Sequence, residues 1–174
     1  MDEIIKILDE KTINSRIVEL AEEINKDYDG EELLVLPVLK GGFMIASELI
    51  KGLNVPVTLD FVIISSYKDD TISSENVEMI KDVDTEVTGK NVLLIDDIID
   101  SGRTLAYLKE ILNMRGPKSI SICTLLDKPE RRVKDVKVDY VGFNIPDEFV
   151  VGYGLDYAQK YRNLPFIGVV EGVE

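Results

Sequence analysis

The chain has 174 residues, of which 45% are hydrophobic and 30% charged, a balance typical of one soluble globular domain. Its formal charge of −13, from 20 basic and 33 acidic residues, argues against a nucleic-acid partner. It has no histidine and one cysteine, Cys123, which excludes Ser-His-Asp and Cys-His catalysis, a histidine-bearing zinc site and a disulfide framework. Because no long apolar run and no signal-peptide core occur, we expect a cytoplasmic protein.

The first third of the chain alternates helical and strand patterns. Four apolar residues recur at steps of four, three and four: Ile13, Ile17, Leu20 and Ile24. This spacing predicts an amphipathic helix over 13–28. The apolar run LLVLPVL predicts a strand buried on both faces at 33–39. After a Gly-Gly pair, the sequence predicts a helix over 43–53, closed by Gly52.

The same alternation continues toward the C-terminus. Residues 55–67 are rich in β-branched side chains and predict a strand, and NVLLID predicts another at 91–96. A helix is expected over about 104–115, where the pair 116–117 (Gly-Pro) ends it, and 119–126 resumes the strand pattern. Strands alternating with helices predict right-handed crossovers, so the expected fold class is α/β with a mainly parallel central sheet flanked by helices.

Ligands bind at the carboxyl ends of the strands in such sheets. Three segments fall at those ends: LKGG (39–42), DDIIDSGRT (96–104) and LLDKPERR (125–132). The polar connection 69–90 is long for a compact domain, and a connection of that length is more often a functional flap than a passive link.

The segment 96–104 carries the most chemical information. A tight turn between a buried strand and a helix directs backbone N–H groups and the positive helix end toward one point, which favours an anion. The turn adds hydroxyl groups, close backbone approach and positive charge: Ser101, Gly102, Arg103 and Thr104. The alternative is an ordinary helix start capped by Asp100 or Ser101.

Three aspartates stand beside this turn: Asp96, Asp97 and Asp100. They would repel a phosphate unless sugar hydroxyls or a divalent cation occupied them, since hard cations bind carboxylate oxygens and bridge to phosphates. The segment therefore indicates a ligand that combines phosphate, ribose hydroxyls and Mg²⁺. The spacings of a Walker A loop and of a dinucleotide-binding fingerprint are absent.

At this point the residues resemble a known family. VLLIDDIIDSGRT resembles the phosphoribosyl-pyrophosphate (PRPP) signature of type I phosphoribosyltransferases, and an aspartate at position 100 is similar to the 6-oxopurine branch. Four further segments are similar to that branch, so the resemblance covers nearly the whole chain: 38–42, 64–67, 125–132 and 141–165. The sequence departs from the pattern at Asp96, where many relatives have glutamate, and at Arg103, where lysine or asparagine is frequent.

The resemblance implies one phosphoribosyltransferase domain over 1–174. It implies a small hood formed by N-terminal residues and about 128–174, and a flexible flap at about 66–88 that closes over the substrate. The implied reaction transfers the 5-phosphoribosyl group of PRPP to N9 of a 6-oxopurine (hypoxanthine and/or guanine) in purine salvage. The products are IMP or GMP and pyrophosphate. Mg²⁺ is the implied cofactor, and a homodimer or homotetramer the implied assembly.

The catalytic and metal-binding roles follow by resemblance. Asp100 is the candidate base for N7 of the purine. Asp96 and Asp97 bind the ribose hydroxyls directly or through Mg²⁺, and because successive strand side chains point to opposite faces, either one could serve only as support. Asp156 corresponds to the ligand of a second Mg²⁺ on pyrophosphate, with an ordinary surface ion pair to Arg162 as the alternative.

The resemblance also assigns the substrate contacts. The 5′-phosphate is assigned to four residues: Ser101, Gly102, Arg103 and Thr104. Pyrophosphate is assigned to four others: Lys40, Gly41, Gly42 and Arg162. The purine is assigned to three residues. Lys128 donates to O6, Phe149 stacks on the ring, and the backbone of Val150 contacts the purine edge. Ser66 and Tyr67 open the flap, and closure would exclude water from the activated sugar.

Two other functions are alternatives to this enzyme. A regulator on the same fold, which senses PRPP or nucleotides and binds RNA or DNA, is disfavoured by the charge of −13. The order of Lys128, Phe149 and Asp156, which follows the purine pocket of the enzymes, also disfavours it. Half of a PRPP synthetase is disfavoured because those chains are about twice as long, with duplicated halves.

Overall fold

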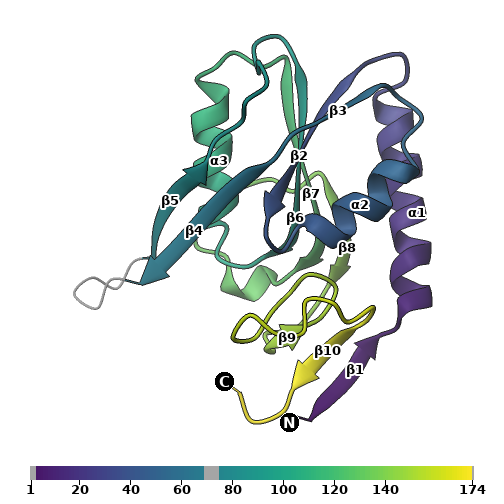
Figure 1. Ribbon diagram of the computed structural model, residues 1–174, viewed down its shortest axis with the longest axis vertical. Helices are drawn as coiled ribbons and strands as arrows, with labels where there is room; N and C mark the ends of the chain where they lie inside the picture. The colour runs from purple at the N-terminus through teal and green to yellow at the C-terminus, as the bar shows by residue number, and fades with distance from the viewer. Residues whose placement is uncertain (1–2, 69–74, 174) are drawn as a thin grey trace.

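The computed structural model describes residues 3–68 and 75–173. Within them, seven strands form a central sheet in the order β5-β4-β2-β6-β7-β8, with β3 also paired to β2 (Figure 1). Their bounds are β2 (Leu33–Leu39), β3 (Val57–Leu59), β4 (Val62–Lys68), β5 (Glu75–Lys81), β6 (Asn91–Ile99), β7 (Ser119–Asp127) and β8 (Tyr140–Asn144). The pairings are parallel except that of β4 with β5. The predicted α/β class with a mainly parallel sheet is confirmed.

Helices cover both faces of this sheet (Figure 1). Their bounds are α1 (Glu10–Asp27), α2 (Phe43–Lys51), α3 (Arg103–Asn113) and the short 3₁₀ helix η1 (Pro129–Arg131). Alternating residues of β6 divide the core: Leu93 and Ile95 pack with α1 and α2, whereas Val92 and Leu94 pack with α3. This is the period of two expected of a strand buried on both faces.

A small antiparallel sheet forms the hood below the central sheet (Figure 1). It joins β1 (Ile4–Leu8), β10 (Ile167–Val170) and β9 (Val150–Val151), so both ends of the chain contribute to it. The predicted hood of N- and C-terminal segments is therefore present. Its strands are short, and no pattern in the sequence predicted β1.

The predicted strand over 55–67 was wrong in its boundaries, because β3 and β4 are separate strands. Between them the carboxylate of Asp60 accepts a hydrogen bond from Phe61 N at 2.7 Å and bonds from the N–H groups of Asp84 and Thr85 at 2.9 and 2.8 Å. These bonds hold a bend that the β-branched composition does not reveal.

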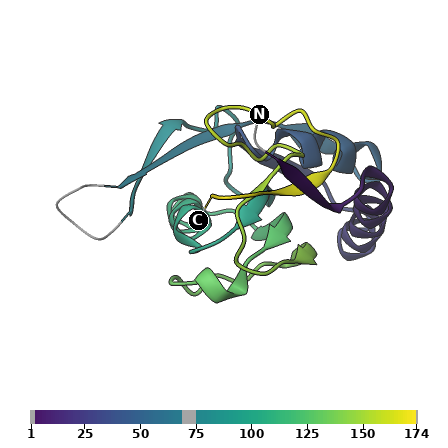
Figure 2. The same cartoon turned by 90° about the horizontal axis from the view of Figure 1, so that it is seen from below.

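The polar segment 69–90 contains a strand that was not predicted. Strand β5 pairs with β4 along its length, and Figure 2 shows the two strands extending away from the body of the molecule. Residues 69–74, between these strands, lie outside the described residues. Within the described part of the chain, no helix is long and apolar enough to cross a membrane.

Candidate active site

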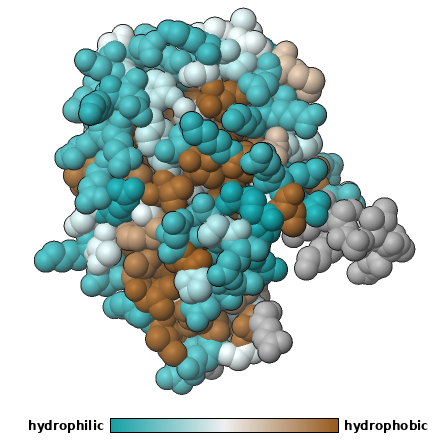
Figure 3. Space-filling view, turned by 180° about the vertical axis from the view of Figure 1, so that it is seen from behind, coloured by the Kyte–Doolittle hydropathy of each residue, from teal (hydrophilic) through white to brown (hydrophobic). Residues whose placement is uncertain are grey.

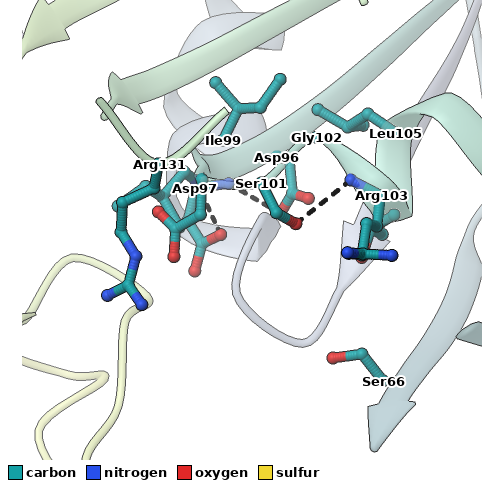
Figure 4. A pocket seen from close by; sticks show the side chains of 12 residues that line it. Ser66, Asp96, Asp97, Ile99, Ser101, Gly102, Arg103, Leu105 and Arg131 are labelled. Atoms are coloured by element: carbon teal, nitrogen blue, oxygen red, sulfur yellow. Dashed lines mark hydrogen bonds between the residues drawn. The ribbon is translucent and has the colours of Figure 1, made fainter. Parts of the chain in front are cut away.

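A cavity of about 320 Å³ lies at the carboxyl end of β6 (Figure 4). Eight of the residues predicted for the site line it: Ser66, Asp96, Asp97, Asp100, Ser101, Gly102, Arg103 and Thr104. They come from β4, β6, the turn that follows β6, and the start of α3. The cavity is therefore at the sheet edge where a parallel α/β protein binds its ligands.

The acidic pair Asp96 and Asp97 lies near the carboxyl end of β6, which continues through both residues to Ile99. Each is 9% exposed, and both line the cavity. Asp96 Oδ1 accepts from Asp97 N at 2.8 Å, and Asp97 Oδ1 accepts from Ile98 N at 2.7 Å. Burial, together with the charge of Asp97, raises the pKa of Asp96 well above its usual range, and burial also raises the pKa of Asp97. A cation or hydroxyl donors in the cavity would therefore stabilise the ionised forms of the pair.

The turn after β6 leaves Asp100 available to a ligand. Gly102 is the N-cap of α3, with φ of 82°, and Ser101 Oγ accepts only a long bond of 3.3 Å from Arg103 N. The alternative in which Asp100 or Ser101 is the N-cap is therefore wrong, because the N-cap is Gly102, whose backbone is in the left-handed region. Among the described residues, no hydrogen-bond partner reaches the buried Oδ1 of Asp100. Such an atom is costly unless a ligand satisfies it.

Two arginines near the cavity were not assigned a role from the sequence. Arg131, on η1, lines the cavity opposite Arg103 (Figure 4). Arg132 lies behind the turn, where its Nε donates to Asp100 O at 3.1 Å and its guanidinium pairs with Asp127. The only available signal was their place at the end of a strand, in LLDKPERR, and such a position alone does not distinguish them from solvated charges.

The loop of Lys40, Gly41 and Gly42 is absent from the cavity lining but contacts the acidic pair. A Cβ on Gly41 would lie 1.9 Å from Asp97 Oδ2, so this contact requires glycine. A Cβ on Gly154, whose φ is +101°, would lie 2.1 Å from Gly41 O. The peptide bond between Leu39 and Lys40 is cis. The loop is thus held between β6 and the hood.

Residues 154–162 of the hood bring further charged groups to this loop. Lys40 Nζ donates to Gln159 Oε1 at 3.2 Å. Arg162 donates to Gly154 O at 2.8 Å and pairs with Asp156 at 3.2 Å. Its positive charge also lowers the pKa of Asp97, against the stronger effect of burial. Two residues predicted to contact pyrophosphate, Lys40 and Arg162, therefore lie on segments that contact each other.

The residues predicted for the purine lie outside the lining of the cavity. Lys128 is 5% exposed, and its N–H donates to Ile99 O at 3.0 Å, beside the end of β6. The ring of Phe149 meets Tyr157 edge to face, with 5.5 Å between the ring centroids. Val150 is buried in β9. The side chain of Tyr67 lies outside the described part of the structure.

A parallel α/β sheet with a hood, and with a glycine turn beside an acidic pair at their shared edge, has the features of a type I phosphoribosyltransferase. The model of the phosphoribosyl transferase domain family matches residues 5–158. The chain belongs to this family, and the predicted resemblance is confirmed.

Individual relatives match almost the whole length of this chain. It is 49% identical to the hypoxanthine phosphoribosyltransferase of Salmonella typhimurium, over 94% of this chain and 93% of that one. It is 49% identical to the hypoxanthine-guanine phosphoribosyltransferase of Bacillus subtilis, over 95% and 92%. A crystal structure of a hypoxanthine-guanine phosphoribosyltransferase from Bacillus anthracis, with a HEPES molecule in its active site, matches with a TM-score of 0.92 at 50% identity, over 97% and 99%.

Proposed function

We propose that this protein transfers the 5-phosphoribosyl group of PRPP to N9 of a 6-oxopurine, hypoxanthine or guanine, giving IMP or GMP and pyrophosphate. The names of its relatives support this substrate class. The observation that carries the proposal is the set of three carboxylates beside the glycine turn, one of which has a buried oxygen with no partner among the described residues. Such a set suits a ligand that brings hydroxyls, a cation and an acidic N–H.

In the proposed reaction, the bond from C1 of the ribose to pyrophosphate breaks as N9 of the purine bonds to C1. The turn from Ser101 to Thr104 holds the 5′-phosphate through N–H groups and hydroxyls. Asp100 accepts the proton from N7, which keeps the purine from accumulating positive charge as N9 attacks. Lys40 and Arg162 stabilise the negative charge that develops on the leaving pyrophosphate.

The purine subsite is proposed on the hood side of the turn. Lys128, a residue that is only 5% exposed, donates to O6, so a 6-oxopurine pairs with its ammonium while adenine, with an amino group there, does not. Phe149 stacks on the ring, and the backbone of Val150 contacts its edge. Ser66, on the arm formed by β4 and β5, lines the cavity from the opposite side, consistent with a flap over PRPP.

Mg²⁺ is the proposed cofactor, and the donor set is compatible with it. Asp96 and Asp97 offer hard carboxylate oxygens with raised pKa, whose ionised forms a cation would stabilise. Among the described residues no group of three His, Cys, Asp or Glu side chains could by itself hold a metal ion, so substrate oxygens and water would complete the coordination. When bound, Mg²⁺ supplies charge neutralisation to the pyrophosphate. Asp156, paired to Arg162, is the proposed ligand of a second ion.

A homodimer or homotetramer remains the proposed assembly, and the cytoplasm the proposed location. Exposed apolar residues support self-association, since large apolar patches often mark interfaces. Ile5 and Ile7 of β1 are exposed, and Figure 3 shows hydrophobic residues gathered on the lower part of one face, where the hood lies. Light scattering would measure the assembly directly.

The test of the proposed function is a spectrophotometric assay with PRPP, Mg²⁺ and each of hypoxanthine, guanine, xanthine and adenine. We expect turnover with hypoxanthine or guanine, and none with adenine. Absence of turnover with every 6-oxopurine would refute the proposal.

A further inference from the structure

The backbone of the turn after β6 is held from behind by one segment. The carbonyls of Asp100 and Ser101 belong to neither β6 nor α3, and residues 132–134 supply their hydrogen bonds. Arg132 Nε donates to Asp100 O at 3.1 Å, and the N–H groups of residues 133 and 134 each donate to Ser101 O at 2.9 Å. The turn therefore depends on a segment about 30 positions later in the chain.

The direction of these bonds sets the direction of the turn's N–H groups. In a trans peptide the carbonyl and the following N–H point to opposite sides. Because residues 132–134 donate hydrogen bonds to the carbonyls of Asp100 and Ser101, the N–H groups of Ser101 and Gly102 point away from that segment. Both residues line the cavity, so the same bonds that hold the turn also turn its donors toward the ligand.

Arg132 is itself fixed in place. Its guanidinium pairs with Asp127 at the end of β7, and the two side chains are 23% and 13% exposed. Asp127 is the register partner of Ile99, the last residue of β6, so the carboxylate that orients Arg132 stands next to the strand that leads into the turn. The side chain of Arg132 also lies against Gly102, where a Cβ would be 3.0 Å from Arg132 Cδ.

We propose that Arg132, oriented by Asp127, is a positioning residue for phosphoribosyl transfer. It fixes the peptide between Asp100 and Ser101, so that the turn presents its N–H groups to the 5′-phosphate and the Asp100 carboxylate to the purine. This inference rests on the proposed function. Arginine suits the role because its rigid fork bonds a carbonyl through Nε and a carboxylate through a terminal nitrogen at once, which a lysine ammonium at the same place does not reproduce.

The experiment compares Arg132→Ala, Arg132→Lys, Asp127→Asn and the Asp127→Asn/Arg132→Ala double variant with wild type. Calorimetry gives Kd for PRPP with Mg²⁺, steady-state assays give kcat and KM for hypoxanthine, and thermal unfolding shows that each variant is folded. The matched control is Lys118→Ala, which breaks an ion pair with Glu31 at the amino ends of β7 and β2, at the edge of the sheet opposite the cavity.

We expect Arg132→Ala to raise Kd for PRPP and to lower kcat, each on the order of tenfold, with KM for hypoxanthine changed by less than about twofold. Arg132→Lys should give no rescue. The effect of Asp127→Asn should disappear in the Arg132→Ala background, because the carboxylate acts through the guanidinium. The Lys118→Ala control should stay folded and keep the wild-type Kd for PRPP.

A folded Arg132→Ala protein with wild-type Kd for PRPP and wild-type kcat would overturn the inference, provided that wild type itself turns over. If Arg132→Ala does not fold, the isosteric Asp127→Asn decides, and an unchanged Kd and kcat in that variant would overturn the inference equally. A wild-type protein that neither binds PRPP nor turns over would instead refute the proposed function.

Discussion

Two buried acidic sites, one at the amino end of β4 and the other near the carboxyl end of β6, have pKa values that are shifted in opposite directions. Asp60, at the start of β4, is 8% exposed, and Asp96 and Asp97, near the end of β6, are each 9% exposed. Burial tends to raise the pKa of Asp60, but bonds from Thr85, Phe61 N, Thr85 N and Asp84 N outweigh it, and the pKa falls to about 2. The pKa of Asp96 is instead raised, first by burial and then by its acidic neighbour.

The difference shows what each carboxylate is built to bind. The donors that Asp60 needs are supplied by the protein, so its charge stabilises a bend between two strands. Asp96 and Asp97 receive few donors and repel each other, so their charge destabilises the protein until a ligand arrives. Asp100, with a buried oxygen that no described residue bonds, belongs to this second group.

Asp100→Asn would give the largest effect on the active-site side of this comparison. The amide keeps the shape of the side chain but removes the base, so we expect kcat to fall by about 10²–10⁴, the range for loss of general base catalysis. Affinity for PRPP should change far less. Steady-state kinetics and PRPP calorimetry check this, and equal losses in kcat and PRPP affinity would remove Asp100 from the base role.

Asp60→Asn tests the structural carboxylate of the comparison. An amide cannot accept as strongly from Thr85, Phe61 N and Asp84 N, so we expect the free energy of unfolding to fall by about 2 kcal/mol at pH 7. Urea unfolding measures it. Turnover of the folded protein should stay near wild type, and a variant as stable as wild type but inactive would reverse the distinction between the two sites.

The sequence predicted the β6 turn far better than it predicted the bend at Asp60. The residues from Asp96 to Thr104 are contiguous, so local patterns of strand, turn and helix already bring them together. The partners of Asp60, namely Asp84 and Thr85, are 24 and 25 positions away, and no local pattern connects them.

Strand β5 and Arg132 were missed for the same reason. The residues of β5 are largely polar, and only pairing with β4 makes them a strand. Arg132 reaches Asp100 across 32 positions, where a sequence shows only one charge among several. The purine residues Lys128 and Phe149 were assigned by family resemblance, because composition and spacing alone describe them equally well as a surface charge and a strand residue.

Asp96→Asn sharpens the comparison by separating stability from function. Removing one of two buried neighbouring charges should raise the free energy of unfolding by about 1 kcal/mol at pH 7, while binding of PRPP with Mg²⁺ weakens. Thermal unfolding and calorimetry measure the two quantities. A less stable variant that keeps its PRPP affinity would mean that Asp96 is structural, as Asp60 is.

The smallest expected effect is a change with pH in the stability difference between wild type and Asp60→Asn. Since the folded pKa of Asp60, about 2, is below the roughly 3.9 of an unfolded aspartate, its contribution is present above the unfolded value and is lost as pH falls through the folded value. Between pH 4 and pH 3 the difference should narrow by about 0.9 kcal/mol. Urea unfolding of both proteins at each pH isolates Asp60, because the other groups titrate alike in the two. A difference that stays constant over this range would show that the bonds to Asp60 do not depend on its charge, and the contrast with the active-site pair would then rest on geometry alone.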